Sequence, residues 1–237
     1  MLSRRFFLAL TPASAIAATQ WDEILGRVLG GRGDDRIALG LKEALSVGTG
    51  NAVMQLGRVD GYFANLAVKI LLPPRLKSAE RTLRLFGMGS MLDELIVGMN
   101  RAAERAAPYA RQIFLGAIRS MTFADVRQIF TGGDTAATVY FRGATTSELI
   151  NAFRPPVTDA LSEVGVVRTY DAFIARAQSI PLMRIERFDL ETYVVTKALD
   201  GLFHVVGEEE RKIRRDPAAR VTAILRDVFG GGRSRTP

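Results

Sequence analysis

Residues 90–106 read SMLDELIVGMNRAAERA, and this stretch decides the fold of the chain. Its apolar residues recur at intervals of three and four, which places them on one face of an α-helix. Ser90 and Asp93 have the spacing of an N-terminal capping box, so we expect the helix to start there. Pro108 should break or kink it. The stretch predicts an amphipathic helix whose apolar stripe consists of Leu92, Leu95, Ile96, Met99, Ala102, Ala103 and Ala106.

Helical signals of the same kind continue on both sides of this stretch. Gly48 and Gly50 should loosen the end of the first helix, and Gly87 is a C-terminal stop for the helix that Pro74 opens. The Pro155–Pro156 pair is expected to interrupt the helical pattern. Helix starts are predicted at Asp34 or Asp35, Pro74, Thr122, Asp134, Thr145 and Asp189.

One segment departs from the helical pattern. Residues 65–72 read NLAVKILL, and their β-branched content predicts an extended segment or a lone strand. No unit repeats at a fixed period, and no linker longer than a turn separates two zones of composition. The prediction is therefore an all-α fold: a single-domain multi-helix bundle over residues 34–230 with at most one short extended segment. Residues 231–237 should form a flexible basic tail.

The N-terminal residues have the layout of a bacterial export signal. Arg4 and Arg5 precede a short apolar run, and small residues follow it. Adjacent arginines favour the twin-arginine route. Ala9 stands where that signal usually has lysine, so the general secretion route stays open. Cleavage after Ala15 or Ala17 would satisfy the A-x-A rule for the removal of such signals.

These features predict where the protein works. Residues 1–17 should be removed as the signal peptide, and residues 18–33 should form a glycine-containing leader. No later apolar run reaches 18 residues, so we expect no transmembrane span after signal removal. The sequence thus predicts a periplasmic or otherwise exported protein of the bacterial cell envelope.

Composition excludes several classes of site. The 237-residue chain has no cysteine and one histidine, which removes thiolate catalysis and the usual zinc sites. It has no dense Asp/Asn loop for Ca²⁺ and no P-loop for a nucleotide, so we expect no metal and no cofactor. The formal net charge is +7, and +5 once Arg4 and Arg5 are removed. A basic excess favours an anionic envelope component as a partner, and an exported protein is expected to meet no nucleic acid.

Six stretches along the chain read LKEALSVGTGNAV, LGRVDGYFAN, MNRAAERAAP, MTFADVRQIFTGGDTAATVYFR, FDLETYVVTKALDGLF and EEERKIRRDPAARVTAILRDVFG. In this order they resemble a bacterial domain-of-unknown-function family numbered 4197. The resemblance implies an envelope location and a largely helical fold. It implies no reaction, ligand or catalytic residue. Family members with a lipid-anchoring cysteine differ from this chain, so the resemblance does not extend to anchoring.

Two polar clusters are candidate binding sites. The first, Asn100, Arg101 and Glu104, lies within the helix that decides the fold. Glu104 is placed to pair with Arg101 at i,i+3, or to reach the charges of Glu209 and Arg214 across a helix interface. A buried ion-pair network of this kind would fix the register of the helices. Ligand binding is the alternative role.

The second cluster lies on the long helix that starts at Asp189. Tyr193, Lys197, Asp200 and His204 are spaced by four, three and four residues and therefore share one stripe. A base, an acid and an ammonium group on one face could support proton transfer. The competing interpretation is a Lys197–Asp200 surface pair flanked by two half-exposed rings.

The hypothesis that follows is a non-catalytic exported binding or scaffold protein. One form of it is a pocket between helices that holds an apolar ligand. An enzyme of unknown reaction, using either polar cluster, is the alternative. A further alternative is attachment to an anionic membrane or cell wall through basic faces around residues 211–220 and the tail.

Overall fold

The computed structural model describes residues 33–163, 165–180 and 186–215, and within these ranges all regular structure is helical. The prediction of an all-α fold is confirmed. The export signal, the leader before residue 33 and the basic tail lie outside the described residues. The elements are α2 (Gly33–Gly57), α3 (Pro74–Leu85), α4 (Gly89–Ala106), the 3₁₀ turn η1 (Ala107–Tyr109), α5 (Ala110–Ser120), α6 (Phe123–Thr131), α7 (Ala136–Glu163), α8 (Val166–Gln178) and α9 (Leu190–Arg215).

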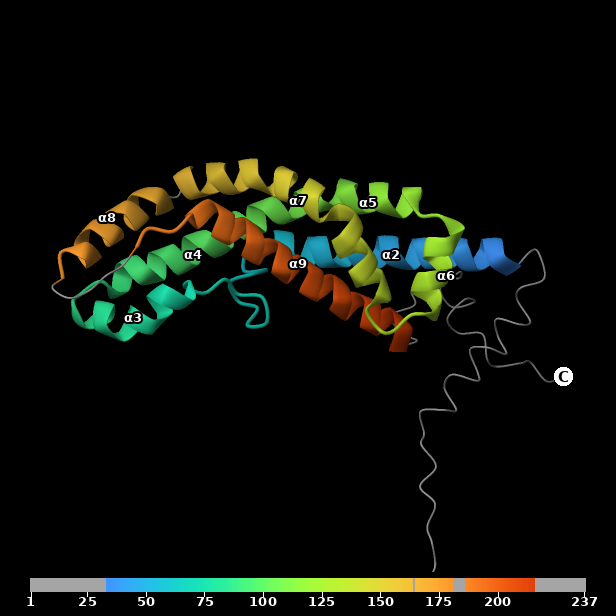
Figure 1. Ribbon diagram of the computed structural model, residues 1–237, viewed down its shortest axis with the longest axis horizontal. Coiled ribbons are helices and arrows are strands. Elements are labelled where there is room, and N and C mark those ends of the chain that lie inside the picture. The colour runs from blue at the N-terminus through green and yellow to red at the C-terminus, as the bar shows by residue number, and fades with distance from the viewer. Residues whose placement is uncertain (1–32, 164, 181–185, 216–237) are drawn as a thin grey trace, which may run out of the picture.

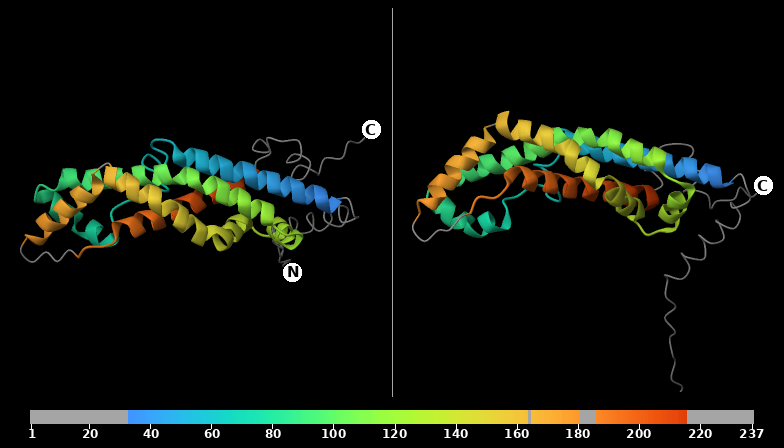
Figure 2. Two further views of the ribbon diagram at one scale, coloured as in Figure 1. Left: turned by 90° about the horizontal axis from the view of Figure 1, so that it is seen from above. Right: turned by 45° about the horizontal axis from the view of Figure 1, so that its top comes forward.

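The helices form an elongated bundle (Figure 1, Figure 2). Over one half of the molecule α2, α5, α7 and α9 lie side by side, and α6 lies at the end of that half against α2 and α7. In the middle of the molecule α4 contacts α7, α8 and α9. α3 packs on α4 at the end of the molecule opposite to α6. No helix within the described residues is both long and apolar enough to cross a membrane. The helix that decides the fold thus joins the two halves of the bundle.

An aromatic cluster joins three helices in the core. Phe114 of α5 meets Phe141 of α7 and Phe203 of α9 edge to face, with ring centroids 5.2 Å and 6.2 Å apart. Aromatic rings favour this arrangement because the positive edge of one ring meets the negative face of the other. The apolar stripe predicted on α4 is buried as expected, with Ile96 partly covered. Both observations place the core where helical periodicity predicts it.

The start of α4 differs from the prediction. The helix begins at Gly89, and its N-cap residue makes no side-chain hydrogen bond, so the predicted capping box of Ser90 and Asp93 is wrong. Asp93 accepts instead from Nη2 of Arg84 at 2.6 Å, which ties α3 to α4. At its other end, the 3₁₀ turn around Pro108 separates α4 from α5, as predicted.

Three other predicted boundaries are confirmed. Thr122 and Asp125 form a capping box at the start of α6. Asp189 accepts from the backbone N–H of Thr192 at 3.0 Å and so caps α9. Gly87 follows α3 with a φ of 73°, the left-handed conformation that glycine adopts without strain.

Two predicted interruptions are absent because the helices pack tightly there. α2 continues through Gly48 and Gly50 to Gly57. A Cβ on Gly48 would lie 3.3 Å from Cδ1 of Ile213, so this glycine lets α9 approach α2. Thr145 and the Pro155–Pro156 pair lie inside α7, where neither a start nor a stop occurs. Tertiary contacts override local propensity at these positions.

The N-terminus of α7 is capped from another helix. Glu210 of α9 accepts from the backbone N–H groups of Ala137 and Thr138 at 3.0 Å and 2.9 Å. Asp134, predicted to cap this helix, pairs with Arg215 instead. A carboxylate at a helix N-terminus satisfies unpaired N–H groups and the helix dipole together. This cap comes from a residue 73 positions away and ties α7 to α9.

Replacing Gly98 with alanine should destabilise the protein. A Cβ on this buried residue of α4 would lie 2.1 Å from Cγ2 of Val166, whose branched side chain has little freedom to move. We expect the free energy of unfolding, measured by urea denaturation, to fall by about 1–3 kcal/mol.

Gly143→Ala is the matched control, because a Cβ on Gly143 meets nothing within 4 Å. Its higher helix propensity should raise the free energy of unfolding by about 0.5–1 kcal/mol. If Gly98→Ala were as stable as this control, the close packing of α4 against α8 would be wrong.

Candidate functional site

The first predicted cluster faces the connection between α2 and α3, residues 58–73. Asn100 is fully buried, and its Nδ2 donates to the carbonyl of Ile70 at 2.8 Å. Its Oδ1 accepts from the N–H of Ile70, also at 2.8 Å. One side chain thereby makes both hydrogen bonds that a neighbouring strand would make. Residues 66–68 form a turn and residues 69–73 are neither helical nor paired in a sheet, so the predicted extended segment is present only in part.

Glu104 is a buried carboxylate that holds the same connection. Its Oε1 accepts from the backbone N–H groups of Tyr62 and Phe63, both at 3.1 Å. Its Oε2 accepts from Nη1 of Arg101 at 2.7 Å, and Nη2 of Arg101 donates to Asp60 at 2.7 Å. Hydrogen bonds to the two carboxylates raise the pKa of Arg101. A buried charge is tolerated when it is paired and hydrogen-bonded in this way.

The other partners considered for Glu104 lie elsewhere. Glu209 accepts from Asn51 of α2 at 3.0 Å and from Lys212 at 2.6 Å. Arg214 donates to Glu210 at 3.0 Å. The pairing of Glu104 with Arg101 is therefore the correct alternative, and the interhelical one is wrong.

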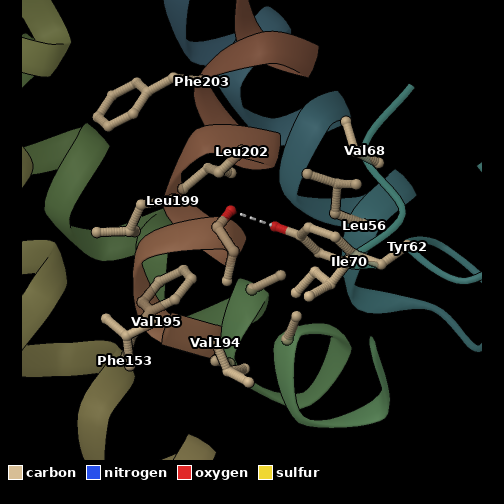
Figure 3. Packing of buried hydrophobic residues seen from close by; sticks show 14 of the residues in the cluster. Leu56, Tyr62, Val68, Ile70, Phe153, Val194, Val195, Leu199, Leu202 and Phe203 are labelled. Atoms are coloured by element: carbon tan, nitrogen blue, oxygen red, sulfur yellow. Dashed lines mark hydrogen bonds between the residues drawn. The ribbon is translucent and has the colours of Figure 1, made fainter. Parts of the chain in front are cut away.

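Tyr62 anchors the connection to α9. Its hydroxyl donates to the carbonyl of Ala198 at 2.7 Å, and its ring is fully buried among apolar side chains (Figure 3). A Cβ on Gly201 would lie 2.7 Å from this ring, so the glycine makes room for it. Burial raises the pKa of Tyr62 far above its usual value. The phenol is thus a permanent hydrogen-bond donor.

The second predicted cluster lies along the outer side of α9. Lys197, Asp200 and His204 are exposed, and Nζ of Lys197 donates to Asp200 at 3.1 Å. Nε2 of His204 lies 3.5 Å from Oε1 of Glu208, one helical turn further along α9. Tyr193 is half-buried, and its hydroxyl donates to the carbonyl of Leu71 at 2.8 Å. Lys197 and Asp200 thus form the surface pair of the competing interpretation, while Tyr193 and His204 make contacts elsewhere, so the four residues do not converge on one site.

A groove opens beside Tyr193, where the start of α9 passes the start of α3. Its volume is about 820 Å³, within the range of pockets that hold small organic ligands. Most of the surface that lines it is apolar, with hydroxyl and carboxylate groups between the apolar parts. The lining residues are Pro73, Pro74, Leu76, Ser78, Glu186, Phe188, Asp189, Thr192, Tyr193 and Thr196.

Phe188 is a fixed wall of this groove. The hydroxyl of Tyr170 donates to the carbonyl of Phe188 at 2.9 Å and accepts from its N–H at 2.8 Å. The Phe188 ring meets the rings of Tyr170 and Tyr193 edge to face, with centroids 5.0 Å and 5.8 Å apart. Phe188 also lines a second hollow of about 220 Å³, on whose border Tyr170 and Leu190 lie. Its backbone and ring are thus both held in place.

Two ionisable groups that line the groove, Asp189 and Tyr193, each have one dominant protonation state at neutral pH. Hydrogen bonds from the hydroxyl and the N–H of Thr192 lower the pKa of Asp189, which keeps its carboxylate ionised at neutral pH. Burial raises the pKa of Tyr193, which keeps its phenol protonated. Within the described part of the chain, no three acidic or histidine side chains are grouped so as to hold a metal ion. The groove combines neutral aromatic walls with an anionic edge.

Sequence patterns did not predict this groove, and Tyr193 is the one predicted site residue that lines it. Its walls come from residues 73–78 and from residues 186–196, two parts of the chain that no local spacing connects. The available signals were Pro73-Pro74 and the aromatic residue before Asp189, and each by itself only marks a helix boundary. The groove therefore depends on tertiary structure.

A comparison with family models gives one finding. The family described as "Protein of unknown function (DUF4197)" matches residues 32–230. Searches of curated proteins and of solved structures find no significant match. The family match confirms the resemblance seen in the sequence and supplies no reaction or ligand.

Replacing Asn100 with alanine should destabilise the protein strongly. The buried N–H and carbonyl of Ile70 would lose their partners, and each unsatisfied group costs about 1–3 kcal/mol. We expect the free energy of unfolding, measured by guanidinium denaturation, to fall by about 2–4 kcal/mol in total.

Asn151→Ala, at an exposed position of α7, is the matched control and should change stability by less than about 0.5 kcal/mol. Equal stability of the two variants would mean that Asn100 does not hold residue 70.

Proposed function

The chain belongs to the DUF4197 family, and from that premise we propose that it is a non-catalytic binding protein of the bacterial cell envelope. Its ligand is a small apolar molecule that lies in the groove between α3 and α9. The groove itself carries the proposal, because it has about 820 Å³ of space and a mostly apolar lining. Pockets with a few fixed polar groups on an apolar lining are typical of small-molecule sites.

The rigidity of the groove supports binding. Phe188 is held through its backbone by Tyr170 and through its ring by two neighbouring tyrosines. Tyr193 is held by its hydrogen bond to Leu71. A site whose walls are ordered before the ligand arrives loses less conformational entropy on binding. The prolines and rings would contact the apolar body of the ligand, and the Thr192 and Thr196 side chains its polar atoms.

The use of the polar side chains favours binding over catalysis. A catalytic acid or base must reach the substrate with a proton or lone pair to exchange. The side chains of Asn100 and Glu104 instead form hydrogen bonds with the backbone of residues 62–70. Lys197, Asp200 and His204 do not line the groove. An enzyme that uses either cluster is therefore the less supported alternative.

The location in the cell envelope rests on the sequence. Arg4 and Arg5, the apolar run and the small residues up to Ala17 have the layout of an export signal. These residues lie outside the described ranges. A periplasmic protein would meet apolar molecules in transit between membranes, which is consistent with a ligand of this chemistry.

Filling the groove should abolish ligand binding. The uncharged fluorescent probe N-phenyl-1-naphthylamine should bind the protein saturably with one site per chain. Thr196→Trp places a large ring in the groove and should weaken this binding at least tenfold, whereas Ser147→Trp, on an exposed position of α7 outside the groove, should leave it unchanged. Fluorescence titration measures all three proteins.

Native mass spectrometry and organic extraction of the protein, purified from the envelope fraction, should identify the natural ligand. Absence of saturable probe binding, or equal weakening by Thr196→Trp and Ser147→Trp, would contradict a ligand site in the groove.

The export proposal is tested separately. In fractionated cells the protein should be found in the periplasm, with a mature N-terminus after residue 15 or 17. Replacing both Arg4 and Arg5 with lysine should keep the precursor in the cytoplasm if the twin-arginine route is used. A full-length protein in the cytoplasm of wild-type cells would contradict export by either route.

A further inference from the structure

The loop of residues 58–69, here called the anchored loop, presents apolar side chains to solvent. Leu66 is 90% exposed and Val59 is 74% exposed. Tyr62 and Val68 of the same loop are buried against the body of the protein. The loop emerges between α2 and α3 as the teal trace that projects from the bundle (Figure 1). The apolar residues of the loop thus fall into two sets. Tyr62 and Val68 attach the loop to the body of the protein, and Val59 and Leu66 face solvent.

The backbone of the anchored loop is fixed. Every N–H group from residue 61 to residue 70 except that of Leu66 donates a hydrogen bond within the protein. A Cβ on Gly61 would lie 2.5 Å from the carbonyl oxygen of Gln55, so the loop folds closely onto the end of α2. Leu66 cannot turn inward without breaking this network. The protein therefore keeps a large aliphatic side chain in water at a rigid position, so docking would order little further backbone.

The charges around the loop favour an anionic surface. Arg58 is exposed, and the ammonium group of Lys69 lies 3.8 Å from the centre of the Phe63 ring. The one acidic side chain of the loop, Asp60, is neutralised by Arg101. The loop thus has two cationic side chains within three positions of its exposed apolar residues in the sequence, in a chain whose formal net charge is +7.

We propose that the anchored loop docks on an anionic lipid surface, with Leu66 and Val59 entering the boundary between headgroups and acyl chains. Arg58 and Lys69 then lie at the level of the lipid phosphates. Apolar side chains that enter this boundary and cations that meet anionic headgroups are the two contributions that bind peripheral proteins to membranes. Two exposed apolar side chains with the cations Arg58 and Lys69 close to them in the sequence match an anionic lipid surface, which offers both apolar chains and negative charge. This surface is separate from the ligand groove, and its role does not depend on ligand binding.

Vesicle sedimentation tests the proposal with the mature chain, which lacks the signal residues 1–17. The protein should bind vesicles of phosphatidylglycerol and phosphatidylcholine and bind pure phosphatidylcholine weakly. Leu66→Ser should weaken binding to the anionic vesicles about tenfold, since it removes a fully exposed leucine from the lipid contact. Val139→Ser, at a 70% exposed position of α7, is the matched control and should bind as the wild type does. All variants share the same terminal residues, so any contribution of those residues cancels in the comparison.

Insertion is measured directly by tryptophan fluorescence. Leu66→Trp should show a blue shift on anionic vesicles and quenching by brominated lipid, beyond any signal of the native Trp21, and Val139→Trp should show neither. Three results would overturn the proposal: no binding to anionic vesicles, equal binding of Leu66→Ser and wild type, or a Leu66→Trp emission that brominated lipid leaves unchanged.

Discussion

The hydrogen bonds that join the side chains of Asn100 and Glu104 to the backbone of residues 62–70 are the interactions on which the rest of the structure depends. Parts of this connection are buried without belonging to a helix or a sheet, so their buried polar groups need partners from side chains. Two residues of α4 provide them. Each of these polar side chains would be costly to bury without a hydrogen-bond partner. The backbone groups of the connection are their partners, so side chains and backbone satisfy one another.

The position of the groove between α3 and α9 follows from the same interactions. From Ile70 the chain continues directly to Pro73 and Pro74, which form one wall. The carbonyl of Leu71 fixes the hydroxyl of Tyr193 and therefore the opposite wall. The exposed tip of the anchored loop lies on the other side of Ile70. The groove and the exposed tip of the loop thus share one support while they use different residues.

Periodicity predicted most of the fold because burial on one face of a helix is a local pattern, as in residues 90–106. Errors arose where a residue outside the local pattern provides the partner. Asp93 pairs with Arg84 and does not cap α4. Glu210, and not Asp134, caps α7. Asn100 and Glu104 were identified because they are polar residues beside an apolar stripe. Their role was not predictable, since their partners lie 30 and 42 positions away. The groove, built from two parts of the chain that lie far apart in the sequence, had no sequence signal of its own.

Amide hydrogen exchange of the native protein tests the central claim most directly. If α4 holds the connection, the amides of Tyr62, Phe63 and Ile70 should exchange as slowly as those in the middle of α4, because the same unfolding event exposes both. The amide of Leu66, at the tip, should exchange rapidly. Rapid exchange throughout residues 61–70 while α4 stays protected would contradict the account.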